Sequence, residues 1–189
     1  MMLKTDYASR IHDHVHSFFS GHVAHREDFG KGPIQSMIPG FHVIALEPGP
    51  KSEVWTYVSV GSGFFEHDGI QRLEFLITAD EPSDKHTERL AMTAFYHHTE
   101  TLGLGHTFPL GEPWLPESTL DHALISLPYP FGQDLEVFCS DGDHVHFYWV
   151  LPITAKESAF RHANGLEALE SIFSETQMNY TDDQRASVV

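Results

Sequence analysis

The central stretch of the chain reads Gly103-Leu104-Gly105-His106-Thr107-Phe108-Pro109-Leu110 and continues through Glu112-Pro113-Trp114 to Leu120. Its glycines and prolines are typical of a loop. A loop of this length in a compact chain either packs on itself or binds something. In the first interpretation its glycines supply unusual backbone angles, while His106 and Thr107 satisfy buried backbone groups. In the second, His106, Thr107 and Trp114 form part of a partner surface, since aromatic anchors often dominate interfaces.

Periodic patterns extend outward from this loop in both directions. Before it, apolar residues at helical spacing predict helices over Thr5–Ser20 and Ser83–Glu100. After it, a helix is expected to begin at the capping pair Thr154 and Glu157, and a last helix at a second cap, Asn164 with Glu167. Alternating, β-favouring residues predict six strands, namely Phe41–Leu46, Val54–Val60, Leu73–Thr78, His122–Leu127, Leu135–Cys139 and His144–Leu151.

These elements predict an α+β fold. We expect a single domain over residues 1–175, in which a mixed or antiparallel sheet is packed by helices at its N-terminus, middle and C-terminus. The chain has 189 residues, 41% hydrophobic and 20% charged, which suits one soluble domain with a real core. Because the sequence becomes polar after Glu175, residues 176–189 are expected to form a flexible tail.

The charge of the chain is strongly negative and unevenly distributed. The formal net charge is −16, and residues 90–189 hold 3 Lys and Arg against 14 Asp and Glu. Such a surface repels nucleic acid and anionic membranes, so neither is an expected partner. The acidity either keeps the protein soluble or steers it toward a basic partner.

The cysteine content and the termini indicate the compartment. The single cysteine, Cys139, excludes an internal disulfide, and the sequence has neither a signal peptide nor an apolar stretch of membrane-spanning length. We therefore expect a cytoplasmic protein. Cys139 lies in an apolar strand pattern and is interpreted as a small buried hydrophobe; the alternative is a thiol nucleophile paired with His144 or His146.

Motifs of known catalytic chemistry are missing from the sequence, and we predict no catalytic residue, cofactor or metal. The best metal candidate is the pair His144 and His146, which point to the same side of one expected strand. A site would need a third ligand across the sheet, for instance His122 or Asp121. Paired imidazoles on a solvent-exposed face are the simpler interpretation, and a metal-dependent enzyme remains as an alternative.

Several motifs in the second half of the chain resemble the suppressor of fused domain family. A Gly-x-Gly-His-Thr loop follows a helix, a strand ends in Leu-Pro, another strand leads into a Pro-Ile turn, and an Asn-Gly helix lies near the C-terminus. The motifs are Leu102–Thr107, Pro116, Leu127-Pro128, His146–Ile153, Lys156-Glu157 and Asn164–Leu169. The resemblance extends more loosely over Phe41–Ala79.

The resemblance implies a helix-packed mixed sheet without enzymatic activity. Single-domain bacterial members resemble immunity proteins, which bind and neutralise a toxin domain in the cell that makes it. The expectation is thus an antitoxin whose acidic C-terminal sheet docks a basic toxin domain, through Asp121, Asp134, Glu136, Asp141 and Asp143. The related animal domain belongs to a repressor that captures a peptide as an added strand, so a peptide-capturing regulatory scaffold is the alternative.

Overall fold

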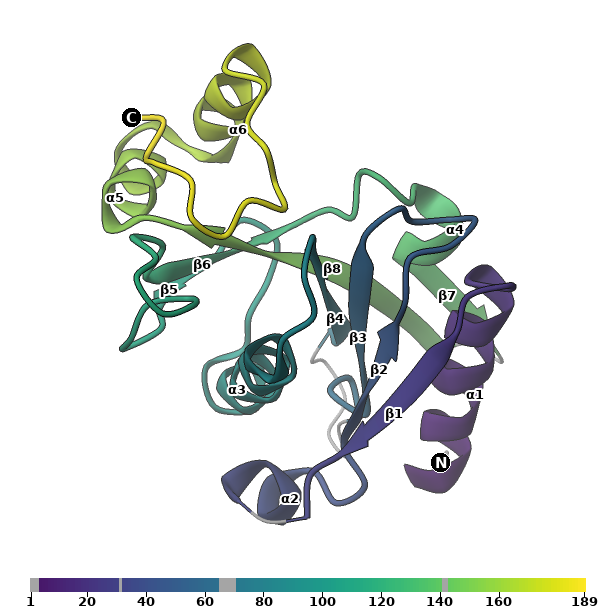
Figure 1. Ribbon diagram of the computed structural model, residues 1–189. Coiled ribbons are helices and arrows are strands. Elements are labelled where there is room, and N and C mark those ends of the chain that lie inside the picture. The colour runs from purple at the N-terminus through teal and green to yellow at the C-terminus, as the bar shows by residue number, and fades with distance from the viewer. Residues whose placement is uncertain (1–3, 31, 65–70, 141–142) are drawn as a thin grey trace.

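The computed structural model describes residues 4–30, 32–64, 71–140 and 143–189. They form one domain with a mixed eight-stranded sheet and helices packed around it (Figure 1), which confirms the predicted α+β class. The helices are α1 (Lys4–Phe18), α2 (Pro33–Met37), α3 (Asp84–Glu100), α4 (Gln133–Glu136), α5 (Ala155–Asn164) and α6 (Leu166–Glu175). The strands are β1 (Ala24–Asp28), β2 (His42–Leu46), β3 (Trp55–Val60), β4 (Arg72–Ala79), β5 (Thr107–Pro109), β6 (His122–Ser126), β7 (Val137–Ser140) and β8 (Asp143–Ile153).

The sheet is organised around its longest strand, β8. The strand order is β1-β2-β3-β4-β8-β6-β5, and β7 pairs with β8 outside this path. The pairing of β4 with β8 is parallel, whereas the other pairings are antiparallel. The first part of β8 therefore lies beside β7, and its last five residues lie beside β6. This arrangement separates the two ends of β8 by about 33 Å at the usual rise per residue.

Helices cover both faces of the sheet, and each face has its own apolar core. On one face Ala45, Tyr57 and Phe75 pack with α3, which lies to the left of β4, β3 and β2 in Figure 1. On the other face Ile44 and Val58 pack with the apolar stripe of α1. Successive strand residues point to opposite faces, so nearly continuous apolar strands supply both cores.

The helix caps explain where two of the predicted helices begin. Ser83 accepts a hydrogen bond from the Lys85 backbone N–H at the start of α3. Thr154 and Glu157 form the predicted reciprocal capping box of α5. The second predicted cap is wrong, because α6 begins after Gly165 (φ 92°) and the Asn164 side chain donates back to the Phe160 carbonyl.

Four short elements escape the sequence pattern. The pattern predicts neither β1 nor α2, and β5 lies inside the central loop. The strand expected over Leu135–Cys139 instead begins as α4, because Leu135 turns into the core, and continues as β7. Four of the five residues of β1 are exposed, so this edge strand lacks the apolar alternation that identifies half-buried strands.

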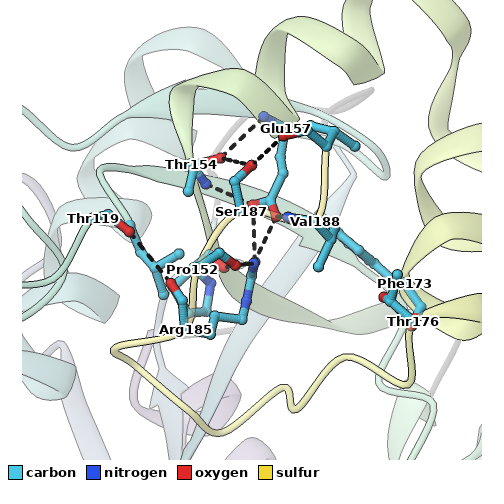
Figure 2. A network of polar contacts seen from close by, with 12 residues as sticks. Thr119, Pro152, Thr154, Glu157, Phe173, Thr176, Arg185, Ser187 and Val188 are labelled. Carbon is cyan, nitrogen blue, oxygen red and sulfur yellow. Dashed lines mark hydrogen bonds and ion pairs between the residues drawn. The ribbon is translucent and has the colours of Figure 1, made fainter.

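The segment 176–189, expected to be a flexible tail, packs against the domain. Arg185 is 8% exposed and donates to the fully buried Glu157 carboxylate at 2.7 and 3.0 Å (Figure 2). Its Nη2 also donates to the Pro152 carbonyl at 3.0 Å, and the Val188 N–H donates to Glu157 at 3.0 Å. The expectation fails because a polar composition conceals one buried arginine whose partner lies on α5.

Candidate partner-binding surface

The Gly-x-Gly-His-Thr loop is fixed to the sheet through its backbone. The Gly105 N–H donates to the Ile125 carbonyl at 2.7 Å, and the Ile125 N–H donates to the His106 carbonyl at 2.9 Å. The His106 side chain is exposed, and its Nδ1 accepts from the Gly103 N–H at 3.2 Å. The backbone of the loop is thus structural, but the His106 side chain bonds an exposed backbone N–H rather than a buried one, and its imidazole stays accessible.

The same loop also holds the C-terminal helices. The Thr107 hydroxyl lies 2.8 Å from the Ser158 hydroxyl and 3.0 Å from His162 Nε2, both on α5. Gly105 has φ +79°, and a Cβ atom there would lie 3.1 Å from Arg161 Nη2 and 3.2 Å from Leu166 Cδ2. Thr107 is therefore half-buried and already engaged inside the domain.

Replacing Gly105 with alanine should lower the free energy of unfolding by about 1–3 kcal/mol, since an unfavourable φ and a close contact act together. Gly111 is the matched control, because it has φ +77° but nothing within 4 Å of its added Cβ. Urea unfolding should show a larger loss for Gly105→Ala than for Gly111→Ala. Equal losses would mean that the contact with α5 and α6 has no energetic weight.

Trp114 lies in the core and is fully buried. Its backbone N–H donates to the Leu120 carbonyl at 2.7 Å. Arg89, on α3, donates to the carbonyls of Pro113 and Trp114 at 2.6 and 3.2 Å and to Glu112 at 3.0 Å. The structure therefore does not present Trp114 as an exposed anchor; the indole anchors the central loop instead.

Those acidic residues expected to dock a partner that the structure describes lie at opposite ends of β8. Asp121 precedes β6, and its backbone N–H donates to Ile153 at the end of β8. Asp134 and Glu136 belong to α4, which leads into β7 beside the start of β8. Asp141 lies outside the described residues, and Asp143 is placed only by its strand at the beginning of β8. They do not form one continuous surface, because the long strand runs between the two groups.

The histidine pair of β8 is not joined by its expected third ligand. His122 stands opposite Ile153 and bonds the adjacent Asp121 at 2.8 Å. His146 lies seven residues earlier on β8, which separates these strand positions by about 23 Å. Among the described residues, no group of three His, Cys, Asp or Glu side chains is arranged to hold a metal ion.

Cys139 is exposed, which corrects the expectation of a buried hydrophobe. It lies on β7 opposite His144, and its Sγ is 3.0 Å from His144 Nδ1. The prediction is wrong because the neighbouring Phe138 packs against the core, which turns Cys139 to the opposite face of β7.

We expect Cys139 to react with a thiol reagent such as dithionitrobenzoate in the folded protein, reaching one equivalent without denaturant. The rate should be within about tenfold of the rate in denaturant, because reactivity follows exposure. A Cys139→Ser variant supplies the blank. A thiol that reacts only after unfolding would contradict this placement of β7.

A buried carboxylate with many donors was not foreseen from the sequence. Glu74, on β4, is fully buried and accepts from the Tyr7 hydroxyl at 2.8 Å and from the Ser59 hydroxyl. Backbone N–H groups of Gly61, Ser62 and Gly63 donate to it at 2.9, 3.2 and 3.2 Å. Burial raises the pKa of Glu74 to about 7, and these donors oppose a larger increase. The glycine turn thus cradles an internal carboxylate.

A second unforeseen feature is a hollow of about 400 Å³ between β1 and the start of α3, here named the α3 groove. Glu27 and Asp84 line its walls, and Trp55 and Tyr57 line it from β3. The two aromatic rings are nearly parallel, with centroids 6.4 Å apart and an angle of 25°. The period-two pattern of β3 puts both rings on one face, but only the folded chain brings the carboxylates to them.

The central-loop motifs and the mixed sheet are features of a known protein family. The family model described as Suppressor of fused protein (SUFU) matches residues 38–186. The chain belongs to the suppressor of fused family. No curated relative matches the sequence. Among the described helices of this family member, none combines the length and apolar character needed to cross a membrane.

Solved structures agree with this assignment. A suppressor of fused homologue from Neisseria gonorrhoeae is 37% identical, with 98% of each chain covered and a TM-score of 0.84. A structure of the Sufu-Fu complex is 13% identical over 96% of this chain and 92% of that chain, with a TM-score of 0.72. Drosophila Suppressor of Fused is 11% identical, with a TM-score of 0.62 over 96% of this chain and 51% of that chain. The last two show the shared fold alone.

Proposed function

We propose that this suppressor of fused family member is a non-enzymatic protein-binding domain that acts as an immunity protein and neutralises a basic toxin domain. Family membership supports protein binding, since a relative of the same fold has been solved in the Sufu-Fu complex. The proposal assigns no catalytic residue and no cofactor to the chain.

The observation that carries the proposal is the state of the basic side chains. Many of them already bind carboxylates of the same chain, so they are not free to offset the charge of the remaining acids. The pairs are Arg10–Asp6, Arg26–Asp28, Lys85–Glu88, Arg89–Glu112 and Arg185–Glu157. With a net charge of −16, the surface attracts a basic domain and accelerates its association.

A specific observation also favours the second candidate, a peptide-capturing scaffold. β1 lies at the end of the sheet and pairs only with β2 among the described strands, so its outer edge is open to an added strand. Its Arg26, Glu27 and Asp28 side chains are charged, however, and charge on an edge strand opposes unspecific pairing. Immunity binding is therefore the first candidate.

The experiment is a kinetic measurement of binding to the protein encoded by the adjacent gene. The association rate constant should fall at least tenfold between about 50 and 500 mM salt, whereas the dissociation rate constant should change much less. An association rate that is insensitive to salt would contradict electrostatic steering and leave solubility as the role of the acidity. No binding at any salt concentration would contradict the immunity function with this partner.

A further inference from the structure

The α3 groove brings together groups that recognise a cation. The strand register aligns His25 with Ala45 and Ala45 with Tyr57, so the Glu27 side chain, two residues from His25, projects on the same face as Tyr57. Asp84 approaches from the first turn of α3. Burial raises the pKa of the Tyr57 phenol, and the negative charges of Asp84 and Glu27 raise it further, so both carboxylates act on this ring.

The carboxylates of the groove are not neutralised within the described part of the chain. Neither Glu27 nor Asp84 forms an ion pair there, although a cationic residue is adjacent to each in sequence. Arg26 points to the other face and binds Asp28 at 2.8 Å, and Lys85 binds Glu88 at 2.6 Å. The groove therefore keeps two negative charges beside the half-buried ring of Trp55, while Tyr57 forms its buried floor.

We propose that the α3 groove binds an arginine or lysine side chain of the protein partner, held between the carboxylates of Glu27 and Asp84. This inference rests on the proposed function, because it names the contact through which a basic partner is held. A hollow of about 400 Å³ accommodates such a side chain with part of its neighbours. Carboxylates give charge-assisted hydrogen bonds to a guanidinium, and the half-buried ring of Trp55 adds a cation–π contact.

The test uses the full chain and acetyl-tetra-arginine amide as the probe. The indole N–H resonance of Trp55, assigned with Trp55→Phe, reports occupancy of the groove. The groove variant is Glu27→Gln/Asp84→Asn. The control is Asp13→Asn/Glu175→Gln, which makes the same charge change at exposed positions on α1 and at the end of α6.

We expect a saturable shift of the Trp55 resonance in the wild type and in the control, and its loss in the groove variant. No shift at about 10 mM peptide, or an equal loss in both variants, would overturn the inference. The affinity for the adjacent-gene protein should fall at least tenfold in the groove variant and less than about threefold in the control. If that protein binds neither the wild type nor either variant, the immunity function is contradicted. The peptide titration alone then tests whether the groove binds a cationic side chain.

Discussion

Replacing Arg185 with methionine should lower the free energy of unfolding by about 3–5 kcal/mol, because it leaves the buried Glu157 carboxylate without its cation. The methionine keeps much of the packing of the arginine stem. The loss of stability therefore reflects the missing positive charge rather than missing packing. Glu157 is fully buried and retains only backbone donors after the substitution, the N–H groups of Thr154 and Val188. Urea unfolding followed by circular dichroism measures the change.

Two further variants distinguish the contribution of the Arg185–Glu157 pair from the effect of any substitution in the C-terminal segment. Gln184→Met alters an exposed neighbour that bonds the Pro116 carbonyl, and it should cost less than about 1 kcal/mol. The double variant Arg185→Met/Glu157→Gln should recover part of the loss, since no charge is then buried alone. A loss below about 1 kcal/mol in Arg185→Met would contradict the buried pair.

The pair also predicts a dependence on pH. Although burial raises it, the Arg185 hydrogen bonds and backbone donors hold the pKa of Glu157 below its usual 4.5. A carboxylate with a lowered folded-state pKa contributes stability above its unfolded pKa and loses it as the pH falls. The wild type should therefore lose this contribution below about pH 4.5, a loss that the double variant lacks.

Replacing Glu74 with glutamine should lower the free energy of unfolding by about 2–4 kcal/mol near pH 6, because the amide nitrogen would face donors where an oxygen now accepts. Five donors point at this carboxylate, from Tyr7, Ser59 and the turn 61–63. Tyr7→Phe removes one of them and should cost about 1 kcal/mol. Thermal and urea unfolding of both variants gives the comparison.

For Glu74, the free energy of unfolding depends on pH with the opposite sign to that expected for Glu157. The folded-state pKa of Glu74 is raised to about 7 from 4.5, so its contribution is complete below 4.5 and is lost as the pH rises through 7. The difference in stability between wild type and Glu74→Gln should therefore narrow from about pH 5 to about pH 8. A difference that widens over this range would contradict the burial of the carboxyl group.

The parts of the fold that follow from the sequence are those in which local pattern and burial agree. The apolar stripe of α1, the alternation of Val145, Phe147 and Trp149 on β8 and the capping box of α5 are all predicted and present. By contrast, β1 is a polar edge strand, and the C-terminal segment is held by the buried Arg185 and by scattered hydrogen bonds such as that of Gln184 to Pro116. Neither creates a periodicity in the sequence, because the partner that fixes each lies far away in the chain.

The candidate sites, too, could be predicted from the sequence only in part. The sequence identifies the Gly-x-Gly-His-Thr loop and the family, yet it cannot tell that Trp114 is buried or that Asp121 and Asp134 lie at opposite ends of β8. The α3 groove joins Glu27, Trp55 and Asp84 from β1, β3 and α3. Charges separated by dozens of residues meet only through the sheet register and the packing of α3.

Co-expression of this chain with the product of the adjacent gene, with bacterial growth as the readout, tests the immunity function most directly. We predict that the neighbour alone arrests growth, that the wild-type chain restores it, and that the two proteins copurify as a stable complex. The groove variant should restore growth less well than the control variant with the same charge change. Toxicity that the wild-type chain neither relieves nor binds would contradict the immunity function.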